Sequence, residues 1–191
     1  MTAPTTTTDT KLPLTIFTIG HSTHPFEEFA AMLAAHGIRQ LVDVRTIPKS
    51  RRHPQYNTEA LAAELAVRGI DYLHMKSLGG LRKPRKDSIN TAWRNDSFRG
   101  YADHMASDDF RQGIDQLIEL ARQKPTVVMC AEAVPWRCHR SLIGDALLAR
   151  GIRVEDIMNA RDRREHELTP FAKIHGYEIT YNAGQPPLFL K

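Results

Sequence analysis

The stretch MCAEAVPWRCHR, residues 129–140, joins an apolar run to a helical pattern. The apolar run, residues 126–131, predicts a buried strand, and the apolar spacing of residues 137–150 predicts a helix. Glu132 and Pro135 lie between them and indicate an irregular loop. A strand followed by a loop and a helix is the repeating unit of α/β proteins.

The same order of patterns recurs along the chain. Further strands are predicted at residues 14–19, 40–44, 70–74, 152–157 and 177–181, and further helices at residues 26–34, 58–65, 98–105 and 108–121. Strands that alternate with helices form mostly parallel sheets. We therefore expect the α/β class, with a single domain whose mostly parallel sheet carries helices on both faces.

The length of 191 residues fits one domain, since domains commonly contain ~100–200 residues. Residues 1–12 are rich in threonine and lack hydrophobic periodicity, so we expect a disordered leader. The α/β domain is expected to cover residues 13–160. Residues 161–191 begin with a densely charged segment, and we expect them to form a C-terminal extension that packs on the domain.

The composition favours a cytoplasmic protein without membrane association. No apolar run approaches the ~20 residues that span a bilayer, and the N-terminus has no basic region followed by an apolar core. The two cysteines agree with a reducing compartment. The formal net charge is only +4, so the position of the charges is more informative than their sum.

Basic residues are concentrated in two predicted loops. They are Arg45, Lys49, Arg51 and Arg52 in the first loop, and Arg82, Lys83, Arg85 and Lys86 in the second. Such clusters can bind phosphate or nucleic acid. The alternative is a solvated surface with scattered ion pairs.

The loops with the most reactive side chains all follow predicted strands. They cover residues 20–25, 45–53, 74–82 and 132–140. Ligands of parallel α/β sheets bind at the carboxyl ends of the strands, where these loops meet. The sequence therefore predicts a functional site at that edge of the sheet.

Several short motifs resemble, in order, those of the bacterial and archaeal family called domain of unknown function 488. They are residues 18–22 (TIGHS), residues 43–45 (DVR) with Pro48 and Ser50, residues 78–80 (LGG), residues 129–132 (MCAE) and residues 138–140 (CHR). The resemblance covers residues 18–157. It implies a compact α/β domain with these signature residues and carries no reaction with it.

Cys138 is a candidate nucleophile, because a predicted helix start and flanking basic residues lower the pKa of a thiol. The alternative is an inert buried cysteine. Cys130 ends a buried strand and is expected to pack. Together with His139 or His21 the two thiols could bind zinc, but seven intervening residues exceed the usual spacing of two to four, so no metal ligands are assigned. His139 continues the apolar stripe of the helix and fits a core position as well as a ligand contact.

The remaining candidates favour an anion site. Arg45 and Arg140 offer guanidinium groups that match a phosphate or carboxylate, although Arg45 could instead form a fixed ion pair with Asp43. Glu132 and Asp43 could supply acid–base chemistry, and His21 is a third candidate for catalysis. Further anion contacts are expected from Ser22, Arg52, His139, Gly79 and Gly80, where the glycines could let the backbone approach a ligand or merely form a turn.

These residues predict an enzyme that binds an anionic substrate, a nucleotide or a nucleic-acid component, at the carboxyl ends of the strands. One alternative is a nucleic-acid-binding module without catalysis, which would use the two basic loops and stack bases on Trp93, Trp136 or Tyr56. Another is a thiol or metal module built on Cys130 and Cys138. The sequence identifies no cofactor, reaction or oligomeric state.

Overall fold

The computed structural model describes residues 13–184, so the predicted leader at residues 1–12 and the end of the C-terminal extension lie outside the described residues. Its main sheet has six strands in the order β3-β2-β4-β1-β5-β6. The strands are β1 (Thr15–Gly20), β2 (Gln40–Asp43), β3 (Asp71–His74), β4 (Thr126–Cys130), β5 (Arg153–Ile157) and β6 (Arg163–Glu165). All pairs are parallel except β5 with β6, which confirms the predicted α/β fold with a mostly parallel sheet.

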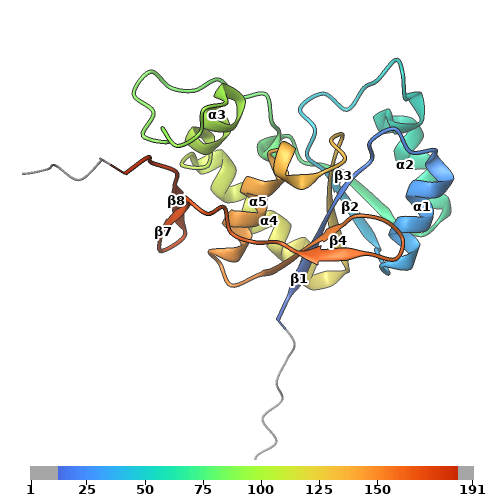
Figure 1. The fold of residues 1–191 in the computed structure, drawn as a ribbon. Coiled ribbons are helices and arrows are strands. Elements are labelled where there is room, and N and C mark those ends of the chain that lie inside the picture. Colours follow the sequence, from blue (N-terminus) through green and yellow to red (C-terminus); the bar gives the residue numbers. More distant parts are fainter. Residues whose placement is uncertain (1–12, 185–191) are drawn as a thin grey trace, which may run out of the picture.

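Helices cover both faces of the main sheet (Figure 1). Helices α1 (Phe26–Ala35) and α2 (Thr58–Val67) pack on one face, and α3 (Asp96–His104), α4 (Asp108–Gln123) and α5 (Arg140–Leu148) on the other. Strand β4 contributes side chains to the cores on both faces of the sheet. Val127 and Met129 join the core under α1 and α2, whereas Val128 and Cys130 join the core under α3–α5, because successive side chains of a strand point to opposite faces.

Helix α5 begins three residues later than the sequence pattern predicts. Pro135–Arg137 form a short 3₁₀ turn, and Cys138 then adopts an extended conformation with φ −134° and ψ 148°. His139 is the cap of α5, which runs from Arg140 to Leu148. Pro135 has no N–H to continue a regular helix, and it suits the first position of the short turn.

The C-terminal segment differs from the predicted pattern. Strand β8 (Glu178–Thr180), inside the predicted strand 177–181, pairs only with β7 (Lys173–His175) in a separate two-stranded sheet. The sixth strand of the main sheet is instead β6, whose exposed residues Arg163, Arg164 and Glu165 have no apolar alternation that could reveal a strand. Within residues 13–184, none of the helices combines the length and apolar character needed to cross a membrane.

A buried polar chain fixes β5 and the C-terminal segment to α5. His166 lies between the carboxylates of Asp145 and Asp156, at 3.2 Å from each. Asp145 also accepts a hydrogen bond of 2.7 Å from the hydroxyl of Tyr181, which is fully buried. Burial alone would lower the pKa of His166, but its hydrogen bonds to Asp145 and Asp156 outweigh burial and raise the pKa to about 9. His166 is therefore a cation at neutral pH.

We predict that His166 makes the stability of the protein pH-dependent on the alkaline side. Because its pKa is raised on folding, its contribution is complete below pH ~6.5 and is lost as the pH rises through about 9. The free energy of unfolding should fall by about 2–3 kcal/mol over that interval. Urea unfolding at a series of pH values measures this, with His166→Gln as the comparison, and parallel pH profiles for the two proteins would contradict the prediction.

Candidate functional site

A cavity of about 420 Å³ opens at the carboxyl ends of β1, β2 and β4, at the predicted edge of the sheet. Four predicted residues line it together, namely His21, Ser22, Arg45 and Glu132. The cavity is completed by Thr23, Ile47, Lys49, Ser50, His53, Ala131 and Ala133. Lys49 belongs to the basic loop that the sequence identified, but His53 and Ser50 were not singled out as ligand contacts.

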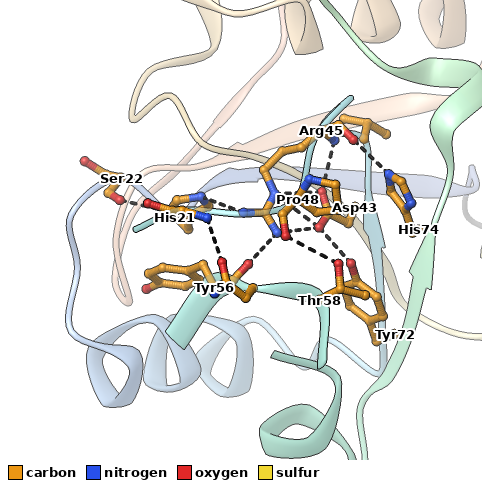
Figure 2. Close-up of polar contacts among 12 residues, drawn as sticks. His21, Ser22, Asp43, Arg45, Pro48, Tyr56, Thr58, Tyr72 and His74 are labelled. Carbon is orange, nitrogen blue, oxygen red and sulfur yellow. Dashed lines mark hydrogen bonds and ion pairs between the residues drawn. The ribbon is translucent and has the colours of Figure 1, made fainter. Parts of the chain in front are cut away.

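Arg45 is the central side chain of this site (Figure 2). Its Nε and Nη2 form a bidentate pair with the carboxylate of Asp43, with an Nη2–Oδ2 distance of 2.6 Å. Nη2 also donates to the carbonyl of Tyr56 at 2.7 Å, and Nη1 donates to Nε2 of His21 at 3.3 Å. Arg45 lines the cavity, yet every guanidinium nitrogen already has a partner within the protein.

His21 is held in one neutral tautomer. Because Nε2 accepts the hydrogen bond from Arg45, the proton resides on Nδ1, which donates to the carbonyl of Ser22 at 2.8 Å. The ring stacks on Tyr56 with a centroid distance of 4.0 Å. Burial, together with the charge of Arg45, lowers the pKa of His21 to about 4. At neutral pH His21 is therefore uncharged, and its available lone pair is occupied.

Asp43 lies behind Arg45 and does not line the cavity. Its side chain is fully buried, and it accepts hydrogen bonds from the backbone N–H and side chain of Arg45 and from the hydroxyl of Tyr72 at 2.9 Å. Burial and the nearby charge of Asp43 raise the pKa of Tyr72 to about 12. A carboxylate surrounded by donors in this way holds Arg45 in position (Figure 2).

Three ionisable side chains remain directed to solvent around the cavity. Lys49 and Glu132 are exposed, and His53 is half-buried. Among the described residues 13–184, none of the three takes part in a salt bridge. These side chains can therefore contact a ligand without first breaking an ion pair.

The loop that carries Glu132 crosses directly over β1. A Cβ at Gly20 would lie 1.7 Å from the carbonyl oxygen of Glu132, so only glycine permits this crossing. Arg140 then fixes the loop from below, because its Nη2 donates to the same carbonyl at 2.6 Å and its Nη1 donates to Oγ1 of Thr18 at 3.2 Å. Arg140 is 1% exposed and does not line the cavity. The hydrogen bonds of Arg140 hold the backbone of Glu132 in position.

Ser22 supports the same loop on its other side. Its backbone N–H donates to the carbonyl of Ala131 at 2.9 Å, and the N–H of His21 donates to the carbonyl of Cys130 at 3.0 Å. Ser22 adopts a left-handed conformation with φ 48°, which a residue with a side chain rarely adopts. Strained backbone of this kind is found preferentially at functional sites.

Cys130, Cys138 and His139 form a separate cluster outside the cavity. Sγ of Cys138 lies 3.7 Å from Nδ1 of His139, and Gly80 packs against the same ring. The neighbouring Cys130 thiol lowers the pKa of Cys138 well below its usual value, although burial opposes this, and the proximity of Cys138 together with burial raises the pKa of Cys130. Two other predicted anion contacts, Gly79 and Arg52, do not line the cavity. Gly79 packs against Thr46, and Arg52 is exposed to solvent.

Together, the fold and this site define an α/β protein with a polar cavity at the carboxyl edge of its parallel sheet. The family model described as Domain of unknown function DUF488 matches residues 25–147, more than half of the chain, and the chain belongs to this family. No curated protein and no solved structure matches it. The match begins after the motif at residues 18–22, although His21 and Ser22 line the cavity.

We predict that Asp43→Asn lowers the free energy of unfolding by about 3–5 kcal/mol, because it leaves the Arg45 cation buried without its counter-charge. Tyr72→Phe is the matched control, since it removes a single hydrogen bond to the same carboxylate and should cost about 1 kcal/mol. Urea unfolding of the three proteins at neutral pH measures both effects. An equal loss of unfolding free energy in the two variants would show that the ion pair stabilises the fold no more than a single hydrogen bond does.

Proposed function

We propose that this protein is an enzyme that binds an anionic substrate, a nucleotide or a nucleic-acid component, in the cavity at the carboxyl ends of β1, β2 and β4. One observation carries the proposal. The side chains of Lys49 and Glu132, which form no salt bridge among residues 13–184, line the same cavity as the fixed Arg45. A cation and a carboxylate that line one cavity supply both an anchor for an anion and a group that can move a proton.

The volume of the cavity favours a small substrate. Small-molecule sites commonly enclose ~300–1,000 Å³, and the cavity here measures about 420 Å³. That volume suits a phosphate ester of mononucleotide size. A long nucleic-acid strand is not needed to fill the cavity.

The side chains divide into binding and chemical roles in this proposal. Lys49 and His53 contact the anionic group, and Ser50 offers a hydroxyl beside them. Arg45 adds its positive potential but remains fixed by Asp43, so it orients the site and does not follow the ligand. Glu132 is the general base or acid, because the only imidazole nitrogen of His21 with a lone pair is bonded to Arg45.

The other predicted catalytic residues receive different roles. Asp43 positions Arg45, since it lies outside the cavity. Cys138 also lies outside the cavity and is 3% exposed, so its catalytic role stays a prediction. Arg140 positions the Glu132 loop through the carbonyl of that residue.

The environment of the aromatic residues favours this proposal over a nucleic-acid-binding module. Tyr56 is buried beneath His21, and its hydroxyl donates to the carbonyl of His24. Trp93 packs among Phe98, Phe171 and Tyr181. Of the three predicted stacking residues only Trp136 is largely exposed, at 58%. One exposed ring provides little of the stacking surface that single-stranded nucleic acid uses.

We predict that Lys49→Ala weakens the binding of phosphate-bearing ligands by roughly tenfold or more, since it removes one charge-assisted contact. Calorimetric titration measures this with pyrophosphate, a set of nucleoside mono- and triphosphates, and a single-stranded oligonucleotide. Lys86→Ala is the matched control, because Lys86 is an exposed lysine of the other basic loop and does not line the cavity. Binding that is equal in both variants, or that is found only with the oligonucleotide, would refute the small-molecule site.

We predict that Glu132→Gln separates turnover from binding. The amide keeps the shape of the side chain but cannot accept a proton, so the kcat for the phosphate ester that binds best should fall by about 100-fold or more. Its dissociation constant should stay within about threefold, or become tighter because a negative charge is removed. A change in binding with unchanged kcat would assign Glu132 to the ligand contacts and exclude it as the acid–base group.

A further inference from the structure

The Cys130, Cys138 and His139 cluster brings together three potential metal ligands from two elements. Cys130 is the last residue of β4, and Cys138 and His139 immediately precede α5. One ligand atom from each residue lies within 4.8 Å of the other two. The loop of residues 131–137 returns the chain to the strand end, so a wide sequence spacing becomes a compact group.

The separation of Cys138 and His139 matches that between two ligands of a tetrahedral metal ion. With Zn–S of ~2.3 Å and Zn–N of ~2.0–2.1 Å, a sulfur and a nitrogen bound to one zinc ion lie roughly 3.6 Å apart. The distance between Sγ of Cys138 and Nδ1 of His139 is 3.7 Å. A shift of a few tenths of an ångström is enough to bring this pair to the ideal separation.

The hydrogen bond of His139 selects the tautomer that a metal ligand needs. Its Nε2 lies 3.2 Å from the carbonyl oxygen of Val44, which can only accept, so Nε2 carries the proton. The lone pair of Nδ1 is then directed toward Cys138. Metal-binding histidines usually donate their other N–H to a carbonyl or carboxylate in this way.

The surrounding backbone holds these groups in place. The N–H of Cys138 donates to the carbonyl of Pro135, and its own carbonyl accepts from both the N–H and the hydroxyl of Ser141. A Cβ at residue 80 would lie 2.8 Å from Nδ1 of His139. Gly80 therefore gives the ring the space that any other residue would fill.

The charge of two thiolates and the type of ligand atoms indicate the class of ion. Both cysteines are buried, at 8% and 3% exposure, and an uncompensated charge is costly there. A divalent cation with two thiolates has no net charge. Two sulfurs and an imidazole suit a borderline-soft ion such as Zn²⁺, whereas Mg²⁺ and Ca²⁺ require oxygen ligands.

We propose that Cys130, Cys138 and His139 bind one zinc-type divalent ion, with three protein ligands and one position left for water or a substrate group. The site is independent of the proposed anion cavity, because none of the three residues lines that cavity. A disulfide between the two cysteines would use the same sulfurs but gives no reason for the fixed tautomer of His139.

Cobalt(II) titration of the reduced, chelator-treated full-length protein tests the proposal. We expect a thiolate-to-cobalt charge-transfer band that saturates near one equivalent and disappears on addition of zinc. Cys130→Ala and Cys138→Ala should each weaken cobalt binding by about 100-fold or more, and His139→Gln by at least about tenfold. Lys49→Ala and the exposed His175→Ala should bind as the wild type does, which separates this site from the anion cavity.

Alkylation of the native wild-type protein tests the site without any variant. Zinc should protect both cysteines from a thiol reagent and raise the unfolding temperature, because a ligand that binds only the folded state stabilises it. The proposal is overturned if no thiolate–cobalt band develops in the reduced protein. It is equally overturned if the band persists in Cys138→Ala, or if zinc leaves the alkylation rate of both cysteines unchanged.

Discussion

The buried pair of Asp43 and Arg45 is the interaction on which the carboxyl edge of the sheet depends. Asp43 ends β2, and through Arg45 it reaches two partners. One is the carbonyl of Tyr56, at the end of the short 3₁₀ helix Pro54–Tyr56 in the same connection, and the other is the ring of His21, in the loop after β1. One guanidinium group thus joins both ends of the β2–α2 connection to the loop after β1. The free-energy cost of burying this ion pair is offset by its bidentate hydrogen bonds and by the further donors around the Asp43 carboxylate. The guanidinium of Arg45 is therefore fixed in place, and in the proposed function ligand contact falls to exposed side chains such as Lys49.

Periodicity alone predicted the parallel sheet, the helices on both faces and the edge where the polar loops meet. It could not show which charges pair. The DVR motif is compatible with both an anion-binding fork and an internal ion pair, and only the position of Tyr56 and His21 decides where each nitrogen of Arg45 goes. The approach of Cys130 to Cys138 stayed an open alternative for the same reason, because spacing along the chain does not show whether a loop returns to its own starting point. Strand β6 was missed because an exposed, fully charged strand has no hydrophobic pattern.

The end of strand β4 and the loop that follows it connect the cavity with the thiol cluster. The carbonyl of Cys130 accepts the N–H of His21 on the cavity side, while its side chain belongs to the core under α5. The carbonyl of Glu132 binds Arg140, whose chain position follows directly after Cys138 and His139. A change in the ligands of the sulfurs would thus reach the cavity through one strand end and one loop. The two sites are separate in their ligands but share a backbone.

The charged sequence of β6 lies at an exposed edge of the main sheet. Strand β6 is the last in the strand order, so one side of its backbone is not covered by another strand of the main sheet. Exposed sheet edges invite pairing with other chains, and charged side chains are a common protection against it. Arg163, Arg164 and Glu165 are all exposed on this short strand, and Arg163 is paired with Glu155 of β5. The charges on this edge strand are therefore expected to disfavour its pairing with a strand of another molecule.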